Sequence, residues 1–585
     1  MTDTSSEPPA RTPVPSVEEA RAMHKAGRYD EAIRAYRRII ADDPANAEAQ
    51  HLAGVLLVQR GSTKDGLGLI SRAVGGAGRQ PRYHNSLGSA QMTAGRPAEA
   101  AESFGNALVL DPDFLDARFN LGVALHAQGK TREAEKVWRV VLDRNPEHAG
   151  ALINLGGLLQ RSRRVEEAGE LFERAAAAHP DSAEALWSLA NLRETQNRLE
   201  DAEAALDRLL AAAPGHRYGQ LLKARLLRRR ERFEEAHPML QEILRQPVHD
   251  VVAIDALFEV GHVLDRMGKY WLAYEAFETG NTRRAQTPSY RAADPRRYRT
   301  RVTDSHGYFT AERLAELAAI GREAAGETDP AQAPVFFVGF PRSGTTLMEQ
   351  MLAGHPRLAT TAERTPLTAA LARLAAEVGE KVSYPDSLRA FTPAVARSCR
   401  ETFAEAAGRI TGGERRLLDK LPLNIVDLGF VNAILPEARV VTALRDPRDV
   451  VLSCFMQRFR PNDAMASFTD MDNTVELYDA VMSLWRHYRE ALTLPWMEYR
   501  YEDLVADVEG TARKVVGFIG EEWDPAVLDY RGRARDTAVA TPSYRDVADD
   551  VYARAVGRWR KYVGPLNAVM PLLKPHVKAF GYDAE

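Results

Sequence analysis

VFFVGFPRSGTTLMEQML occupies residues 335–352, and its order of residue types predicts a strand, a tight loop and a helix. The apolar run 335–340 is typical of a buried strand. In the loop that follows, Gly339 and Gly344 allow the backbone to turn close to a ligand. The N–H groups of such a loop and of the next helix start converge where the helix dipole adds positive potential. The stretch therefore predicts a site for a phosphate or a sulfate.

The loop departs from that of an ATPase at one position. Gly339-x4-Gly344 has P-loop spacing, but Thr345 stands where the Walker lysine belongs. The available cation is Arg342, inside the loop. An anion-binding nucleotide site fits this loop and ATP hydrolysis is disfavoured. A P-loop kinase or NTPase, and a loop with a purely structural role, remain the alternatives.

Short apolar runs and long helical stretches alternate after this loop. The runs are VFFVGF, RRLLDKL, ARVVTAL and WMEYRYEDL. Such alternation predicts a parallel sheet with crossover helices. We expect residues 332–585 to form an α/β, P-loop-like domain with a central parallel sheet flanked by helices.

Residues 17–284 form a repeat array: seven units keep a period of 34 over about 17–250, and an eighth follows after a three-residue slip. Small residues recur at Ala20, Gly54, Gly88, Gly122, Gly156, Ala190 and Ala224, and again at Ala32, Gly66, Ala100, Ala134, Ala168, Ala202 and Ala236. Prolines close units at Pro44, Pro112, Pro146, Pro180 and Pro214, because proline cannot continue a helix. Each unit is predicted to be a helical hairpin. The pattern resembles the tetratricopeptide repeat and predicts an α-helical superhelix of about eight units.

The resemblance implies a groove for a protein or peptide partner. Asn120 and Asn154 lie one period apart, with Ser86 and Ser188 in the same register. In related arrays this asparagine holds the backbone of an extended peptide; a solvated helix position without a ligand is the alternative. Assembly into a homodimer is a second use for the array. The basic run RLLRRRER (225–232) is expected to be a solvated helix face.

Composition excludes several classes of protein. The 585 residues include 77 Lys and Arg against 81 Asp and Glu, so the net charge is −4, unlike that of a general nucleic-acid binder. Two cysteines, Cys399 and Cys454, are too few for a disulfide framework or a cysteine-rich zinc site. No apolar run approaches the ~20 residues of a membrane span. We expect no bound metal and a cytoplasmic protein.

Two segments are expected to lie outside the domains. Residues 1–16 have no apolar core of a secretory signal and are interpreted as a disordered tail. Residues 285–331 are interpreted as a linker, irregular in AQTPSYRAADPRRYRT and helical over 309–326.

PRSGTT after a buried strand resembles the 5′-phosphosulfate loop of sulfotransferases. These enzymes transfer a sulfuryl group from PAPS (3′-phosphoadenosine 5′-phosphosulfate) to a hydroxyl or amine. The closest likeness is to the tyrosylprotein sulfotransferases and to bacterial fusions of tetratricopeptide repeats with a sulfotransferase domain, over about 335–562 in scattered blocks. The resemblance implies PAPS as co-substrate, 3′,5′-ADP as product and no metal. It assigns the sulfate and 5′-phosphate to Arg342, Ser343, Gly344, Thr345 and Thr346.

Further blocks extend the resemblance to the rest of the nucleotide. VVTALRDPRDVVLSCF (440–455) resembles the 3′-phosphate block and implies contacts from Arg445 and Ser453. A guanidinium makes forked, charge-assisted bonds to phosphate; an Arg–Asp surface cluster is the alternative. Tyr501 could lie against the nucleotide or in the core. Ser543 and Arg558 fall in a C-terminal block that resembles a loop closing over the nucleotide, where Trp559 is expected to be core.

The resemblance also implies a catalytic group. Glu363, in HPRLATTAERTPL (355–367), follows the loop proline at the distance of the glutamate base in the tyrosylprotein enzymes. Lys420, in LLDKLPLN (417–424), and Arg342 would stabilise the leaving oxygen. Ala362 and Thr365 stand where the family pattern has a second acid and an arginine, so the resemblance does not extend to the tyrosine-peptide contacts there. In the alternatives, Glu363 is merely solvated and Lys420 merely pairs with Asp419.

These patterns predict a PAPS-dependent sulfotransferase that works by in-line displacement, with a protein tyrosine as one candidate acceptor. The array would raise the local concentration of a protein partner or substrate. Two alternatives remain: a scaffold whose nucleotide-binding domain does not catalyse, and a sulfotransferase for carbohydrate, lipid or small-molecule acceptors.

Overall fold

A computed structural model of the chain describes residues 13–583, except 78, 163, 327–331, 362, 380–381 and 531–551. The chain forms two compact units. One comprises residues 1–192 and 204–214, and the other comprises 193–203 and 215–585. The division lies within the repeat array, so the last two repeats share a unit with the α/β domain.

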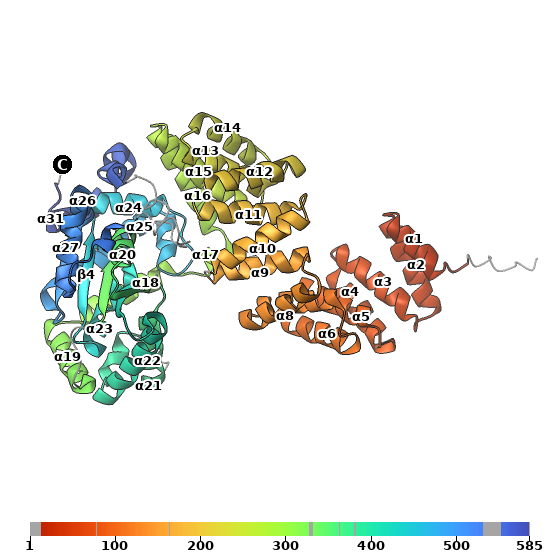
Figure 1. The fold of residues 1–585 in the computed structure, drawn as a ribbon, viewed down its shortest axis with the longest axis horizontal. Helices are drawn as coiled ribbons and strands as arrows, with labels where there is room; N and C mark the ends of the chain where they lie inside the picture. Colours follow the sequence, from red (N-terminus) through yellow and green to blue (C-terminus); the bar gives the residue numbers. More distant parts are fainter. Residues whose placement is uncertain are drawn as a thin grey trace, which may run out of the picture. The chain divides into compact units, whose positions relative to one another are not determined.

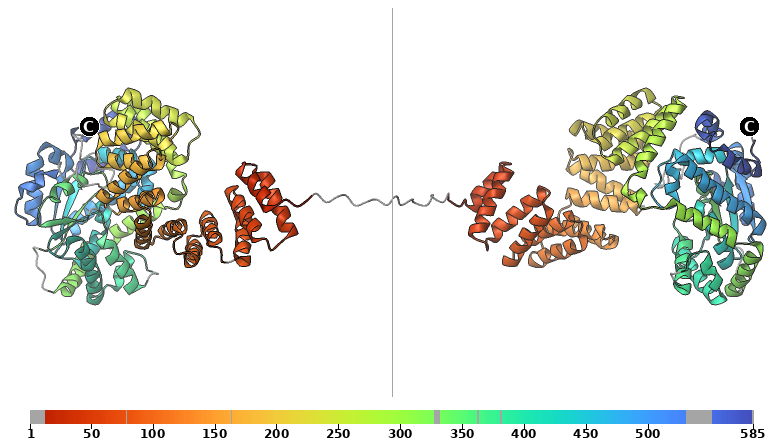
Figure 2. Two further views of the ribbon diagram at one scale, coloured as in Figure 1. Left: turned by 45° about the vertical axis from the view of Figure 1, so that its right-hand side comes forward. Right: turned by 180° about the vertical axis from the view of Figure 1, so that it is seen from behind.

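The first sixteen helices of the described chain form eight successive hairpins (Figures 1 and 2). They are α1 (Val17–Lys25) with α2 (Tyr29–Asp42), α3 (Ala47–Gln59) with α4 (Thr63–Gly76), α5 (Pro81–Thr93) with α6 (Pro97–Leu110), α7 (Leu115–Ala127) with α8 (Thr131–Arg144), α9 (Ala149–Arg161) with α10 (Val165–Ala178), α11 (Ala183–Thr195) with α12 (Leu199–Ala212), α13 (Arg217–Arg229) with α14 (Phe233–Arg245), and α15 (Asp250–Arg266) with α16 (Tyr270–Ala285). The predicted helical repeat array is confirmed.

The recurring small residues lie where the two helices of a hairpin touch. A Cβ added to Gly122 would lie 2.3 Å from Nε1 of Trp138, and one added to Gly156 would lie 2.6 Å from the ring of Phe172. Both aromatic side chains are buried. Larger residues at these positions would therefore force the helices apart.

The segment after the array is more regular than expected. It contains α17 (Pro288–Arg291), α18 (Pro295–Tyr308) and α19 (Ala311–Ala325). The interpretation of residues 285–300 as irregular was wrong, because Asp294 caps α18 by accepting from the amides of Arg296 and Arg297. Arg301 of α18 pairs with Asp427, so this helix packs on the α/β domain.

A five-stranded parallel sheet forms the centre of the α/β domain (Figure 1). Its order is β2 (Leu358–Thr360), β3 (Arg416–Lys420), β1 (Val335–Gly339), β4 (Arg439–Leu444) and β5 (Trp496–Arg500). The helices of the domain are α20 (Thr345–Leu352), α21 (Pro366–Val378), α22 (Pro393–Thr411), α23 (Leu428–Ile434), α24 (Pro447–Phe455), α25 (Met471–Ala491), α26 (Tyr501–Ala506), α27 (Val508–Ile519), α30 (Val563–Leu566) and α31 (Met570–Ala579). The predicted α/β class is confirmed.

Helices cover both faces of the sheet, and β1 shows how. Val335 and Phe337 share a hydrophobic core with α20 and α27. Phe336 and Val338 point to the opposite core, which α22, α23 and α25 complete. Alternate residues of a strand face opposite sides, so a continuous apolar run is required here.

The last repeats belong to the second of these cores. Tyr274 of α16 stacks on Phe455 with ring centroids 5.0 Å apart. Asn281 of α16 is buried and donates to the carbonyl of Phe455 at 2.9 Å. The final hairpin is therefore packed into the α/β domain.

The basic run of residues 225–232 is a solvated face only in part: Arg230, Glu231 and Arg232 are exposed, as expected. Arg225 and Arg228 both donate to the carboxylate of Glu259, at 2.8 and 2.7 Å, and Arg229 pairs with buried Glu194 at 3.1 Å. The expectation was wrong for these three arginines, because acidic residues of the neighbouring repeats face them.

Two searches of the described residues are negative. None of their helices combines the length and the apolar character that crossing a bilayer requires. They contain no group of three or more His, Cys, Asp or Glu side chains placed to hold a metal ion.

Candidate active site

Each of the five strands presents predicted site residues at its carboxyl end. The phosphate loop follows β1, Glu363 follows β2, Lys420 ends β3, Arg445 follows β4 and Tyr501 follows β5. Parallel strands end at one edge of a sheet, and ligands of open α/β sheets bind in the crevice there. Residues scattered over more than 160 positions thus meet at one edge.

The phosphate loop is tight and conformationally strained. Gly344, the N-cap of α20, has a φ of 93°. Arg342 has a φ of 70° and Glu363 one of 66°, in the left-handed region that residues with a Cβ rarely adopt. Strained backbone of this kind gathers at functional sites, where the surrounding structure enforces it.

Gly344→Ala is expected to destabilise the domain and to abolish nucleotide binding. A Cβ at Gly344 would lie 2.4 Å from Cδ2 of Tyr501, and the left-handed backbone would cost a residue with a Cβ about 1–2 kcal/mol more. Thermal unfolding and 3′,5′-ADP binding measure the two effects. Gly412→Ala is the matched control, because Gly412 has a φ of 68° and nothing within 4 Å of an added Cβ. Equal effects of the two substitutions would contradict the steric argument.

Arg342, Ser453 and Arg445 converge beside the loop. Nε of Arg342 donates to Oγ of Ser453 at 3.0 Å, and Nη1 of Arg445 donates to the carbonyl of Arg342 at 3.1 Å. The guanidinium of Arg445 also lies 5.0 Å from the ring centroid of Tyr501. Nε of Arg445 is buried without a hydrogen-bond partner among the described residues. Two cations and a hydroxyl in this cluster have the chemistry of a phosphate site.

The residues around Arg445 are buried, so the alternative of an Arg–Asp surface cluster was wrong. Arg448 pairs with Asp446 at 2.8 Å and lies 3.8 Å over the ring of Trp559. Asp449 accepts from the amide of Trp559 at 2.8 Å. Trp559 is buried, as predicted. Tyr501 is also buried, and its ring lies against Gly344 of the loop.

Glu363 and Lys420 form an ion pair, with Oε1 of Glu363 2.7 Å from Nζ of Lys420. Among the described residues Oε2 of Glu363 has no hydrogen-bond partner, and the side chain is 35% exposed. Lys420 is buried and also pairs with Glu349 of α20, at 2.9 Å. The alternative in which Lys420 merely pairs with Asp419 was wrong, because the carboxylates of Glu349 and Glu363 surround its ammonium.

Opposing effects set the charge state of Lys420. Burial would lower the pKa of its ammonium, but Glu349 and Glu363 outweigh burial and raise the pKa above its usual value. Lys420 is therefore a fixed positive charge. Glu349 was not identified from the sequence, because no motif marks it. The feature that could have revealed it is a carboxylate one turn after the phosphate loop, on the buried helix α20.

Asp419, beside Lys420, predicts a pH dependence of stability. Burial, and then the charge of Glu349, raise the pKa of Asp419 to about 7. The unfolded pKa is about 4, so the protonated carboxyl stabilises the fold fully below pH about 4. This stabilisation is lost as the pH rises to about 7. Over this range the free energy of unfolding falls by up to about 4 kcal/mol.

Asp419→Asn removes the titrating group and is expected to remove this loss. The difference in thermal midpoint, variant minus wild type, should increase from pH 5 to pH 8. A difference that stays constant over this range would show that Asp419 does not titrate there.

The remaining predicted residues are placed differently. Ser343, Thr345 and Thr346 are buried in the loop and the first turn of α20. Ser543 lies outside the described residues. Arg558 pairs with Asp265 of the last repeat at 2.9 Å rather than with the phosphate cluster.

The predicted asparagine positions of the array are internally bonded. Nδ2 of Asn120 donates to Oδ1 of Asn85 at 3.1 Å, and Nδ2 of Asn154 donates to the carbonyl of Gly150 at 2.9 Å. Ser86 bonds to His51 at 2.8 Å. These half-buried side chains are therefore not purely solvated positions.

Comparison with known families agrees with both halves of this architecture. Residues 334–525 match the model of the sulfotransferase family. Tetratricopeptide repeat models match residues 23–89, 85–148, 127–178 and 159–226. The chain thus combines tetratricopeptide repeats with a sulfotransferase-family domain, as the period of 34 and the PRSGTT loop predicted.

Individual relatives are distant. An uncharacterized protein of Aquifex aeolicus is 25% identical over 347 residues, 58% of this chain and 44% of its own length. The protein-tyrosine sulfotransferase of Drosophila melanogaster is 26% identical over 272 residues, 43% of this chain and 51% of its own length. The chain thus spans about half the length of these relatives. The solved structure of Pseudomonas aeruginosa PilF, 19% identical, covers 36% of this chain and 95% of its own, with a TM-score of 0.32.

Proposed function

We propose that the protein is a PAPS-dependent sulfotransferase that acts on an acceptor hydroxyl. The observation that carries the proposal is the meeting, at one sheet edge, of a phosphate loop, the Arg342–Ser453–Arg445 cluster and the Glu363–Lys420 pair. The first two bind anions, and the third supplies a base beside a fixed cation. The family match of residues 334–525 supports the same reaction class.

The residues present fit PAPS. Arg342, Ser343, Thr345 and Thr346 with the loop amides would hold the 5′-phosphosulfate, and Arg445 with Ser453 would hold the 3′-phosphate. The unpartnered Nε of Arg445 and the left-handed loop at Gly344 support this fit. When bound, PAPS supplies the sulfuryl group and a good leaving group, 3′,5′-ADP.

Glu363 is proposed as the general base. Its Oε1 is held by Lys420 at 2.7 Å, so the carboxylate has a fixed orientation and Oε2 can accept the proton of the acceptor hydroxyl. Nζ of Lys420 and the guanidinium of Arg342 offset the negative charge that develops on the leaving oxygen. Glu349 holds Lys420 in place from the other side.

A protein or peptide is the proposed acceptor class, with tyrosine as the candidate side chain. This rests on the repeats, which provide a surface for a protein partner, and on the likeness to protein-tyrosine sulfotransferases. We place the reaction in the cytoplasm as part of the same proposal.

Nucleotide binding tests this function against an NTPase or kinase. Isothermal titration of the full chain with 3′,5′-ADP and with ADP should show clearly tighter binding of 3′,5′-ADP, because only that ligand carries a 3′-phosphate. Tighter binding of ADP would favour the NTPase class, and no binding of either ligand would contradict the proposed site.

A further inference from the structure

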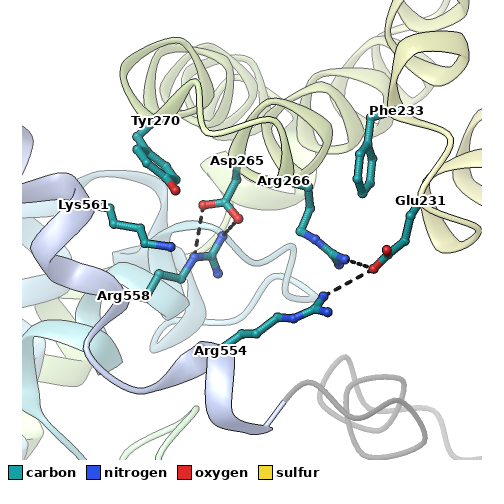
Figure 3. A pocket seen from close by; sticks show the side chains of 8 residues that line it. All are labelled: Glu231, Phe233, Asp265, Arg266, Tyr270, Arg554, Arg558 and Lys561. Atoms are coloured by element: carbon teal, nitrogen blue, oxygen red, sulfur yellow. Dashed lines mark hydrogen bonds and ion pairs between the residues drawn. The ribbon is translucent and has the colours of Figure 1, made fainter.

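The last repeat and the C-terminal segment line a common cavity of about 350 Å³ (Figure 3). Asp265 and Arg266, at the end of α15, line it from the array, and Arg554, Arg558 and Lys561 line it from the C-terminal segment. Figure 3 shows two sets of ion pairs across it, one centred on Asp265 and one on Glu231.

The ion pair at Asp265 is the stronger of the two. Nη2 of Arg558 lies 2.9 Å from Oδ2 of Asp265, and Nε lies 3.2 Å from Oδ1. The hydroxyl of Tyr562 donates to Oδ1 at 2.6 Å. The side chains of Arg558 and Asp265 are only 25% and 13% exposed. Burial would lower the pKa of Arg558, but Asp265 outweighs it and raises that pKa.

The pair at Glu231 is weaker. Nη1 of Arg554 lies 3.4 Å from Oε1 of Glu231, and both side chains are about 60% exposed. Exposed ion pairs of this kind contribute little, whereas a forked pair reinforced by a hydroxyl is strong and directional. Asp265 is therefore the main polar attachment of the array to the segment.

The same segment continues into the predicted nucleotide site. The carbonyl of Ala555 accepts from Nη2 of Arg445 at 2.6 Å. The amides of Gly557 and Trp559 donate to the two carboxylate oxygens of Asp449, at 2.7 and 2.8 Å. Asp449 lies on α24, the helix that follows Arg445. Residues 555–562 thus connect Asp265 to Arg445 through direct contacts.

We infer that Asp265 is a positioning residue: the last repeat holds residues 555–562 in place and thereby orients Arg445 for the 3′-phosphate. The role of Arg445 in this inference rests on the proposed function. The tetratricopeptide array is then part of the nucleotide site as well as a partner surface. Because coupling between sites is reciprocal, nucleotide binding also stabilises the last hairpin.

The test compares Asp265→Asn with Glu259→Gln in the full chain. Glu259 lies on the same helix and its side chain is similarly shielded, at 10% exposed, but its ion partners, Arg225 and Arg228, are within the array. Asp265→Asn is expected to weaken 3′,5′-ADP binding about 10-fold, within the usual range of coupling between sites. The KM for PAPS should rise with it while kcat changes less than about 2-fold. Glu259→Gln should leave the nucleotide affinity within about 2-fold.

Hydrogen exchange provides the readout that is independent of the nucleotide. In ligand-free Asp265→Asn, the peptide that covers Gly557 and Trp559 should exchange faster than in wild type, and in Glu259→Gln it should not. Unchanged exchange in Asp265→Asn overturns the inference, as does faster exchange with unchanged 3′,5′-ADP affinity. If wild type binds no 3′,5′-ADP, the proposed function fails, and with it the stated role for Arg445. The exchange result still decides whether Asp265 orders the segment.

Discussion

Glu363→Gln is expected to reduce sulfuryl transfer by about 10²–10⁴-fold, the usual contribution of a general base. The amide keeps the size of the side chain but cannot accept the acceptor's proton. Lys420 retains Glu349 as a partner at 2.9 Å, so the fixed cation stays in place. The affinity for 3′,5′-ADP should therefore change by less than about 3-fold.

The control for Glu363→Gln is Glu437→Gln. Nη1 of Arg400 donates to Oε2 of Glu437 at 3.1 Å, so this carboxylate also pairs with a cation. Glu437 lies between α23 and β4, at the opposite end of the sheet. This control should retain the full rate. Near-normal turnover by Glu363→Gln would remove Glu363 from the mechanism and leave the base unassigned.

Arg445→Ala is expected to weaken binding of 3′,5′-ADP about 10- to 100-fold more than binding of ADP. Hydrogen bonds to charged groups contribute about 1.5–3 kcal/mol, and only 3′,5′-ADP presents a 3′-phosphate. Arg445 also donates to the carbonyls of Arg342 and Ala555, so both ligands should lose a smaller, common part of their affinity. Titration calorimetry with the two nucleotides measures both parts.

Arg439→Ala is the matched control for Arg445→Ala. Arg439 begins the same strand that Arg445 follows, and its guanidinium donates to the carbonyl of Phe518, remote from the loop end of the sheet. Arg439→Ala should leave the ratio of the affinities for 3′,5′-ADP and ADP unchanged. Equal losses for ADP and 3′,5′-ADP in Arg445→Ala would show that this arginine does not distinguish the 3′-phosphate.

The fold was predictable where local chemistry determines it. A period of 34 places small residues such as Gly122 against large ones such as Trp138, and this contact depends only on residues within one hairpin. The strand and loop at 335–344 were equally clear. Helix α18 was missed, although Asp294 followed by Pro295 is a helix-start signal, because its many polar residues suggested an irregular segment.

The site was predictable in part, because motifs mark residues but not their distant partners. The sequence placed Glu363, Lys420, Arg342 and Arg445 in four separate blocks, and the strand order brings them to one edge. Glu349 and Asp265 could not be assigned. The partner of Glu349 is 71 positions away by residue number, and Asp265 meets Arg558, 293 positions away, only through tertiary packing.

Transfer of labelled sulfur tests whether the protein moves a sulfuryl group from PAPS to an acceptor. Purified protein, and Glu363→Gln beside it, would be incubated with sulfur-labelled PAPS and a desalted lysate, and the label would be separated by class of product. Label is expected in protein with wild type, and none above background with the variant. Label in glycan, lipid or small molecules would keep the enzyme and contradict the protein acceptor. No label in any fraction, from a chain shown to bind 3′,5′-ADP and supplied with a broad panel of acceptors, would contradict the transfer reaction itself.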